Sequence, residues 1–240
     1  MSNSNKMTKC IELGSFEAVR NGVPLRYKIQ TITPELLEDC LDLMVQYFIP
    51  REPISIYLRL MEDPDAVNCM KEMWRKTMNT GQAIVALEET KDNTVNIVGA
   101  NMTLVVEKEL KEKDKDPPKE YKNENFEKLL GSVIELTNRA NIFEKYDIDK
   151  YLTAYGLAVH SNYHGYQIGY RLLQCRQPLC EALGVKATGT VFTAKVSQHI
   201  ASKAGFELLA EQIYKSYLYK GEYIYQNLEG DMKFMAVKYN

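Results

Sequence analysis

The sequence contains no apolar run that approaches the roughly 20 residues of a membrane-spanning helix. Its first residues, MSNSNK, lack the apolar core of a secretory signal, and Ser2 stands where N-myristoylation requires glycine. Neither sign of charge dominates, because 30 Lys and Arg residues meet 32 Asp and Glu residues for a formal net charge of −2. We therefore expect a protein that binds neither membranes nor nucleic acid.

Cysteine and histidine are scarce in ways that exclude common sites. The five cysteines are odd in number and show no CxxC spacing, so we expect free thiols in a reducing cytoplasm rather than a disulfide framework. Of the three histidines, His160 and His164 have HxxxH spacing. That spacing directs two ligands at one metal only on a helix, and here it falls in a predicted turn, so we expect no metal site.

The residues that are present describe an ordinary globular chain, 45% hydrophobic and 26% charged over 240 residues. Apolar periodicity changes several times between the strand-like and the helix-like pattern. Helices are predicted at 33–48, 65–80, 126–146, from 167 onwards and at 197–204. A hairpin is predicted at 16–33, with strands at 83–88, 95–106, 152–159, 189–193, 206–214 and 232–239. This order predicts one mixed α/β domain.

Two local features modify this pattern. Residues 107–122 are a mixed charge run that holds two prolines, which favours a solvated loop. Pro178 lies inside the helix that begins near residue 167, where proline should kink or interrupt it.

The most informative segment is the short polar turn that follows the strand at 152–159. It carries Gly165 and Gly169 and leads into a helix. Such a turn lines up free backbone N–H groups at a helix N-terminus, where the helix dipole is positive. Because this arrangement binds phosphate groups, the segment predicts a diphosphate-containing cofactor.

Two common nucleotide-binding patterns do not fit this turn. A Rossmann fingerprint places G-x-G-x-x-G in the first βα unit, whereas this turn lies past the midpoint and spaces its glycines as Gly165-x-x-x-Gly169. A P-loop needs Gly-Lys-Ser/Thr, which the sequence lacks. NAD, FAD and ATP are therefore not expected, and acyl-CoA is the remaining candidate.

Three blocks, taken in order, resemble the GNAT superfamily of N-acetyltransferases. The strand, turn and helix at 155–173 are similar to motif A, usually Arg/Gln-x-x-Gly-x-Gly/Ala. The segments TAKVS at 193–197 and SKAGFE at 202–207 are similar to motif B, which typically ends in Lys-x-Gly-Phe-Glu. The segment FIPREPI at 48–54 resembles the Phe-x-x-x-Glu-Pro-Leu signature of insect arylalkylamine N-acetyltransferases. The resemblance spans nearly the whole chain from about Leu25.

Motif A departs from the family pattern at two of its three defining positions. His164 takes the Arg/Gln position and Gln167 the middle glycine position, whereas Gly169 keeps the last. Gln167 is expected to be tolerated if its φ is helical. His164 is either a replacement phosphate neighbour or a solvent-facing turn residue. We expect Arg171 to be a solvated helix residue rather than a phosphate ligand.

The resemblance implies a GNAT domain over residues 23–240, preceded by an N-terminal extension and the start of the hairpin at 1–22. The implied fold is mixed, α+β-like, with a central, mostly antiparallel sheet, a splayed pair of parallel strands and helices on both faces. Acetyl-CoA is implied as co-substrate without a metal, and a small primary amine as acceptor, in a cytoplasmic monomer. Direct transfer in a ternary complex is expected, since no cysteine lies in the motif blocks.

The resemblance also implies roles for three side chains. An amine of pKa about 10 must lose its proton before it attacks a thioester. Glu52 carries over as the base, acting directly or through water; its alternative is an exposed carboxylate at a helix end. Ser197 and Thr193 stand at hydroxyl positions expected to assist the departing CoA thiolate. For Ser197 this role is compatible with an N-cap of the following helix.

The cofactor site is expected to consist mostly of backbone. Leu157, Ala158 and Val159 would pair with the amides of the pantetheine arm as a strand-like extension. The pyrophosphate would be held at the turn by His164, Gly165, Tyr166, Gln167, Ile168, Gly169 and Tyr170. The amine pocket is expected to be lined by Tyr47, Tyr57, Tyr214 and Tyr217, although each tyrosine alone is more often a packing residue.

Three functions remain open on the sequence. The leading one is acetylation of a small arylalkylamine such as dopamine, serotonin, octopamine or tyramine. A second keeps the enzyme but changes the acceptor to a polyamine, a hydrazine-like amine or a protein N-terminus. The third is a catalytically weak acyl-CoA-binding sensor, which the departures at His164 and Gln167 favour and the retention of Glu52 and Ser197 disfavours.

Overall fold

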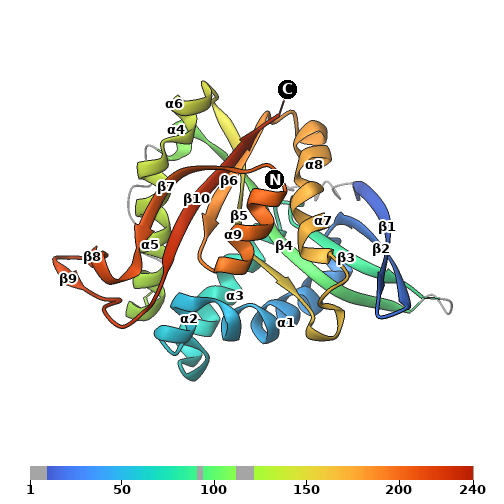
Figure 1. Cartoon of the computed structure of the whole chain (residues 1–240), viewed down its shortest axis with the longest axis horizontal. Coiled ribbons are helices and arrows are strands. Elements are labelled where there is room, and N and C mark those ends of the chain that lie inside the picture. The colour runs from blue at the N-terminus through green and yellow to red at the C-terminus, as the bar shows by residue number, and fades with distance from the viewer. Residues whose placement is uncertain (1–9, 91–93, 112–121, 240) are drawn as a thin grey trace, which may run out of the picture.

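The alternating apolar residues form an eight-stranded sheet in the computed structural model, which describes residues 10–90, 94–111 and 122–239. Its strands are β1 (Glu12–Arg20), β2 (Val23–Thr31), β3 (Ile84–Glu89), β4 (Val95–Glu107), β5 (Lys150–Val159), β6 (Ala187–Phe192), β7 (Glu207–Ile213) and β10 (Asp231–Lys238). They lie side by side in the order β1-β2-β3-β4-β5-β6-β10-β7 (Figure 1). A separate short hairpin, which the sequence pattern did not predict, consists of β8 (Leu218–Tyr219) and β9 (Glu222–Tyr223).

The helices follow the predicted apolar periodicity. They are α1 (Leu37–Tyr47), α2 (Pro53–Tyr57), α3 (Pro64–Met78), α4 (Lys108–Lys111), α5 (Glu124–Ala140), α6 (Ile142–Tyr146), α7 (Ile168–Gln174), α8 (Arg176–Leu183) and α9 (Lys195–Lys203). A single helix predicted at 126–146 is in fact two, because Asn141 adopts a left-handed conformation between α5 and α6. The predicted interruption by Pro178 is confirmed: α7 ends before Cys175, and the proline lies in the first turn of α8, where its missing N–H is tolerated.

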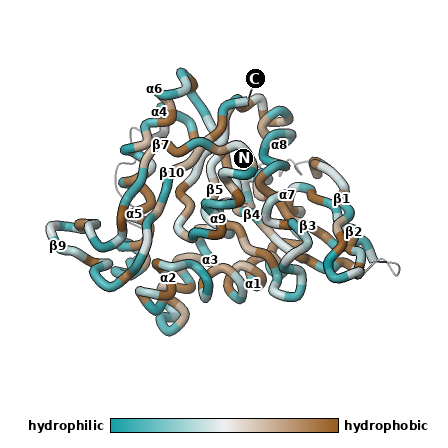
Figure 2. The backbone as a smooth tube through the Cα atoms, viewed as in Figure 1, coloured by the Kyte–Doolittle hydropathy of each residue, from teal (hydrophilic) through white to brown (hydrophobic). Residues whose placement is uncertain are grey.

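Both faces of the sheet are covered by helices. Along β3, Val85 and Leu87 belong to the core formed with α1, α3 and α5, whereas Ile84 and Ala86 belong to the core under α7 and α8. This alternation is the period-2 geometry of a strand that is buried on both sides. Figure 2 shows the resulting distribution, with apolar stretches along the strands and their inner helices and hydrophilic residues on the outer turns.

The sheet opens at its one parallel pair. Strands β5 and β6 are joined by a single described residue pair, Leu152 with Thr188, whereas the other neighbours are antiparallel. Beyond that pair β5 continues to Val159 while still paired with β4. One edge of β5 near its C-terminus is therefore not taken up by β6. The mixed α/β fold with a splayed parallel pair agrees with the sequence prediction.

Two predictions concern segments that are only partly described. The charged run at 107–122 was predicted as a solvated loop, but Glu107 ends β4 and Lys108–Lys111 form the short helix α4, so the prediction is wrong for this part. Residues 112–121 lie outside the described residues. The predicted N-terminal extension contains β1, which pairs with β2 around the expected turn at Asn21 and Gly22, both with positive φ. The division into segments at residue 22 stays a prediction.

Candidate active site

The unpaired edge of β5 is the first part of the site. The predicted pantetheine-binding residues pair with β4, as Leu157 with Asn101, Ala158 with Ala100 and Val159 with Gly99. The N–H of His160 donates to the carbonyl of Val98 on β4 at 3.0 Å. Because a trans peptide directs its C=O and N–H to opposite sides, the carbonyl of Val159 points away from β4. Backbone groups of this segment are thus directed toward the open side of the sheet.

A glycine explains why the FIPREPI segment lies beside this edge. Gly156 has φ +121, and a Cβ built on it would lie 2.9 Å from Met44 Cε and 3.0 Å from Phe48 Cε2. Only a residue without a side chain allows α1 and the residue that follows it to approach β5 this closely. Phe48, the first residue of the FIPREPI segment, therefore packs against Gly156, the residue that precedes Leu157 on β5.

The turn after β5 contains a residue in the left-handed conformation. Gln167 has φ 62 and ψ 13, so the condition of a helical φ, under which glutamine was expected to be tolerated here, is not met. Gln167 precedes α7 as its N-cap, and Gly165 has φ +88. The reason is geometric: the chain must reverse from β5 into α7, and this position uses the conformation that glycine adopts without strain. The first amides of α7 at Ile168, Gly169 and Tyr170 have no partner within the helix.

His164 and Tyr166 lie on either side of Gly165 and differ in exposure. Tyr166 is 9% exposed, and its carbonyl accepts a hydrogen bond from the Tyr27 hydroxyl at 3.2 Å. His164 is exposed, with its Nε2 3.2 Å from the Val159 carbonyl oxygen and 3.3 Å from Nη1 of Arg51. Nearby, the pKa of His160 is lowered by burial and by the charges of Arg51 and His164. The turn is therefore tied both to β2 and to the FIPREPI segment.

Glu52 is buried rather than exposed. It is 6% exposed and caps α2, accepting hydrogen bonds from the N–H of Ile54 at 3.0 Å, the N–H of Ser55 at 2.6 Å and the hydroxyl of Ser55 at 2.6 Å. The alternative of an exposed helix-end carboxylate is thus wrong. A buried carboxylate needs such donors, since its burial is otherwise strongly unfavourable.

A cluster of tyrosines lies next to Glu52. Tyr225 packs against Tyr57, Tyr214 and Tyr217, with ring centroids 5.8, 6.0 and 5.6 Å apart. Burial first, and then the negative charge of Glu52, raises the pKa of the Tyr214 hydroxyl; the same two effects act on Tyr225. Both hydroxyls therefore stay protonated as hydrogen-bond donors. Three of the four predicted pocket tyrosines meet here, whereas Tyr47 packs on His160 instead, with centroids 4.4 Å apart.

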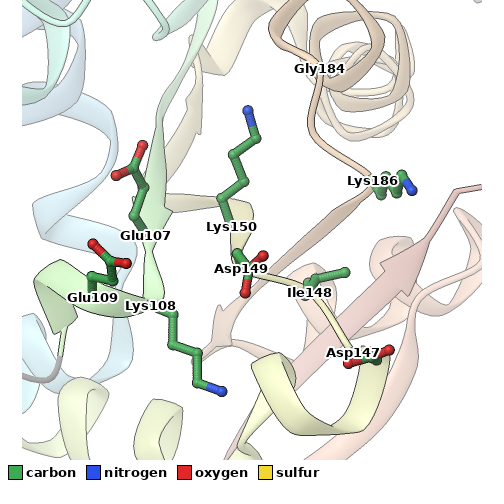
Figure 3. A pocket seen from close by; sticks show the side chains of 9 residues that line it. All are labelled: Glu107, Lys108, Glu109, Asp147, Ile148, Asp149, Lys150, Gly184 and Lys186. Atoms are coloured by element: carbon green, nitrogen blue, oxygen red, sulfur yellow. The ribbon is translucent and has the colours of Figure 1, made fainter.

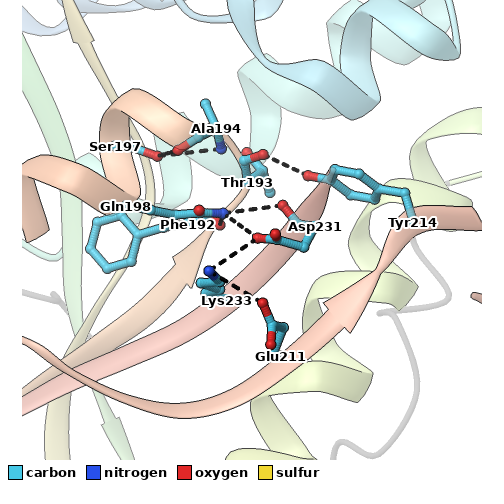
Figure 4. Close-up of polar contacts among 9 residues, drawn as sticks. All are labelled: Phe192, Thr193, Ala194, Ser197, Gln198, Glu211, Tyr214, Asp231 and Lys233. Carbon is cyan, nitrogen blue, oxygen red and sulfur yellow. Dashed lines mark hydrogen bonds and ion pairs between the residues drawn. The ribbon is translucent and has the colours of Figure 1, made fainter. Parts of the chain in front are cut away.

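The second motif block is connected to this cluster (Figure 4). The hydroxyl of Tyr214 donates to the carbonyl of Thr193 at 2.6 Å. The N-cap role considered for Ser197 is wrong. The N-cap of α9 is Ala194, and Ser197 occupies the third helical position. Its hydroxyl donates to the Ala194 carbonyl at 2.7 Å and accepts from the Ala194 N–H at 3.3 Å. The helix starts two residues earlier than the sequence suggested, because this backward bond closes its first turn.

A neighbouring polar network fixes the end of β6 to β10. The side-chain amide of Gln198 donates to the carbonyl of Phe192 and to both the carbonyl and the carboxylate of Asp231 (Figure 4). Lys233 in turn lies 3.7 Å from Asp231 and 3.2 Å from Glu211. The segment that carries Thr193 and Ser197 is therefore fixed by the hydrogen bond from Tyr214 and, through Gln198, by the hydrogen bond to Asp231.

One pocket lies away from these residues. Its volume is about 640 Å³, and it is lined at the opposite end of β5 by mixed charges that include Glu107, Lys150 and Lys186 (Figure 3). Lys150 begins the strand that Val159 ends. This pocket contains none of the motif residues.

The cysteines of the described core are unsuited to carry an acyl group. Burial raises the pKa of the thiols of Cys40, Cys175 and Cys180 to about 12, which keeps them protonated at neutral pH. Within the described ranges there is no group of three or more His, Cys, Asp or Glu side chains arranged to hold a metal ion. No helix among the described residues is long and apolar enough to cross a membrane.

Sequence comparison finds no matching protein-family model and no match among curated proteins. Solved structures do match. A putative arylalkylamine N-acetyltransferase 7 from the mosquito Aedes aegypti superimposes with a TM-score of 0.88 and 27% identity over 98% of both chains. Arylalkylamine N-acetyltransferase 2 from Aedes aegypti has a TM-score of 0.76 and 22% identity, over 89% of this chain and 99% of that chain.

A polyamine N-acetyltransferase from Drosophila melanogaster, which forms N-acetylagmatine, has a TM-score of 0.74 and 16% identity over 88% of this chain and 99% of that chain. The last two likenesses show the fold alone. The fold is that of the GNAT N-acetyltransferases. Within that fold, the structure resembles the putative arylalkylamine N-acetyltransferase 7 from Aedes aegypti, and this likeness supports an enzyme that acetylates amines.

Proposed function

We propose that the protein transfers an acetyl group from acetyl-CoA to the primary amine of a small arylalkylamine, with Glu52 as general base. One observation carries the proposal: the buried carboxylate of Glu52 lies beside Tyr214, whose hydroxyl binds the backbone of Thr193. Thr193 follows the carboxyl end of β6, and parallel strands place their carboxyl ends at the same edge of a sheet. The base and the open edge of β5 therefore share one end of the sheet.

The proposed cofactor site uses the backbone described above. Leu157, Ala158 and Val159 offer a strand edge to the pantetheine amides, by the same geometry that adds a peptide to a sheet. The amides of Gly165 and of 167–170 offer donors to the pyrophosphate, whereas the N–H of Tyr166 donates to the carbonyl of Tyr163 at 3.4 Å. Acetyl-CoA supplies the activated acyl group, and the protein orients it with its thioester toward the opening between β5 and β6.

The chemistry follows from the protonation state of the amine. Glu52 accepts a proton from the substrate ammonium, directly or through one water, and the neutral nitrogen then attacks the thioester carbonyl. The bond from carbon to sulfur then breaks, the nitrogen gives up its second proton, and that proton reaches the departing thiolate, directly or through the hydroxyl of Ser197 or Thr193, to form the thiol of CoA. In the unliganded protein Ser197 donates to its own helix turn, so its hydroxyl must rotate to act on sulfur.

The aromatic walls favour an arylalkylamine as the acceptor. Tyr57, Tyr214, Tyr217 and Tyr225 pack around one another next to the base, and aromatic side chains stack on an aromatic ring with about 0.5–1.5 kcal/mol beyond area burial. The agmatine and polyamine acetyltransferases with the same fold make a polyamine the second candidate. A panel of tyramine, dopamine, serotonin, agmatine and spermidine, assayed for thiol release, ranks the two acceptor classes.

The decisive experiment is Glu52→Gln. We expect kcat to fall about 10²-fold or more, because the amide cannot accept the ammonium proton. Binding of CoA, measured by calorimetry, should be unchanged. The matched control is Asp63→Asn, since Asp63 caps α3 by accepting from the N–H groups of Asp65 and Ala66 without belonging to the proposed site.

Both variants lose a carboxylate cap and should lose similar stability, whereas only Glu52→Gln should lose turnover. A wild-type rate in Glu52→Gln would remove Glu52 as the base. Binding of CoA by the wild-type protein without turnover of any amine would instead favour the acyl-CoA sensor. A cytoplasmic, monomeric state is expected and stays a prediction.

A further inference from the structure

Arg51 ends the 3-10 turn at Ile49–Arg51, and its guanidinium lies at the open edge of β5. Its Nη1 is 3.3 Å from the carbonyl oxygen of Val159 and 3.3 Å from Nε2 of His164. Its guanidinium carbon lies 5.4 Å from the centroid of the Tyr47 ring. This side chain is therefore placed where the carbonyl of Val159 points away from β4.

The three polar atoms cannot all be hydrogen-bonded to one another. Nε2 of His164 is 3.2 Å from the Val159 oxygen, to which it donates only when it carries the proton. In that state it cannot accept from Arg51; without the proton it accepts from Arg51 but faces the Val159 oxygen as a second acceptor. No carboxylate among the described residues pairs with Arg51. An anionic oxygen would therefore be a better acceptor for the guanidinium than its present partners.

Other cations flank the same turn. A Cβ on Gly165 would lie 3.0 Å from Cδ of Arg20, and Nη1 of Arg20 is 3.5 Å from the carbonyl oxygen of Asn162. On the α9 side, Nζ of Lys203 lies 5.0 Å from the centroid of the Tyr170 ring. Positive charge thus reaches the turn from three separate elements, although the protein as a whole is slightly acidic.

We propose that Arg51 binds the diphosphate of acetyl-CoA, supplying a positive charge to the cofactor site from outside motif A. This inference rests on the proposed function. When the cofactor binds, the guanidinium exchanges the Val159 carbonyl for phosphate oxygens. That exchange frees the carbonyl to accept a hydrogen bond from an amide of the pantetheine arm. Arg51 thereby connects the two halves of the cofactor site.

The test is the affinity of Arg51→Gln for CoA and for dephospho-CoA, measured by calorimetry. Dephospho-CoA keeps the diphosphate and lacks the 3′-phosphate, so the pair separates the two anionic groups. We expect both ligands to bind about tenfold more weakly, as for the loss of a charge-assisted hydrogen bond. Arg51→Lys should recover part of the affinity. The matched control is Arg59→Gln, which removes the charge of another exposed arginine, one that pairs with Glu62.

The outcomes separate this inference from the proposed function. If the wild-type protein binds no CoA, the proposed function fails. If the wild-type protein binds CoA and Arg51→Gln binds it equally well, only the role of Arg51 is overturned. A loss confined to CoA would place Arg51 on the 3′-phosphate and contradict the diphosphate assignment. If Arg59→Gln loses as much affinity for CoA as Arg51→Gln, the effect comes from the net charge of the protein, and the assignment of Arg51 to the diphosphate is overturned as well.

Discussion

At the scale of single residues, Gln167 differs in its backbone conformation from the other non-glycine residues of the turn, because it alone among them has a positive φ. A side chain in the left-handed region is disfavoured by roughly 1–2 kcal/mol, whereas glycine adopts it freely. Glycine also has more freedom to lose on folding, which offsets about 0.5–1 kcal/mol of that gain. The balance at this position therefore favours glycine slightly.

We predict that Gln167→Gly raises the free energy of unfolding by about 0.5 kcal/mol. The matched control is Gln177→Gly in α8, an exposed helical position where glycine should lower it by about 1 kcal/mol. Urea titration of both variants measures the two signs. If Gln167→Gly instead lowers the free energy of unfolding, the glutamine side chain stabilises the fold by more than its left-handed backbone costs, and the prediction is wrong.

Single residues were also where the sequence was least informative. The Glu-Pro segment identified Glu52, and its three donors come from Ile54 and Ser55 in the next turn, but its burial depends on tertiary packing. Arg51 lies inside the same segment at a variable position, so nothing in the pattern distinguished it. Tyr225 lies where no helical or strand period is present, and only tertiary packing shows it at the centre of the tyrosine cluster.

At the scale of elements, helix α9 begins with a hydroxyl whose two roles are separable. Ser197 closes the first turn through Ala194, and we also propose that it assists the leaving thiolate. A net hydrogen bond of this kind contributes about 0.5–1.5 kcal/mol to stability. A hydroxyl that stabilises developing negative charge affects kcat instead.

We predict that Ser197→Ala lowers kcat at least about tenfold while unfolding changes by only about 1 kcal/mol. The control is Ser202→Ala, an exposed serine of the same helix, which should leave kcat within about twofold. Steady-state kinetics and thermal melting provide the two readouts. If both variants keep full turnover, Ser197 is a structural residue and the assistance comes from elsewhere.

Element boundaries were predictable wherever glycine, proline or a clear period marked them. The hairpin turn at Asn21 and Gly22 and the interruption near Pro178 are two examples. The break at Asn141 was not foreseen, because the apolar period continues across it and only the left-handed residue ends α5. The start of α9 was misplaced for a similar reason: a serine was taken as a cap although it bonds backward from inside the helix.

At the scale of the whole molecule, one buried arginine holds the opening of the sheet in shape. Arg176 is 1% exposed; its Nε donates to the side-chain oxygen of Asn101 at 3.0 Å, and its Nη1 lies 3.4 Å from the hydroxyl of Thr188. Asn101 in turn donates to the carbonyl of Gly156, and Thr188 to that of Leu152. Burial lowers the pKa of Arg176 to about 10, so it remains charged at neutral pH. The guanidinium of Arg176 thus adds a side-chain connection from β4 to β6, and through Asn101 and Thr188 to β5.

We predict that Arg176→Leu lowers the free energy of unfolding by about 1–3 kcal/mol, because Asn101 loses a buried partner. The urea midpoint at constant m-value measures this loss. Affinity for CoA should fall in parallel, since the bulge at Gly156 would no longer be fixed. An unchanged or higher midpoint would contradict the prediction and show that desolvation of the charge outweighs its hydrogen bonds.

The fold class was predictable because alternating strands and amphipathic helices allow few arrangements. The open end of the sheet was expected only through resemblance, since no local pattern shows where two parallel strands separate. Leu152 and Thr188 are the one ladder pair that joins β5 to β6 among the described residues. A ligand bound at this opening would contact both β5 and β6 and would connect the two strands. Binding of the ligand would then slow amide hydrogen exchange along β5 and β6 together, including at positions far from the ligand.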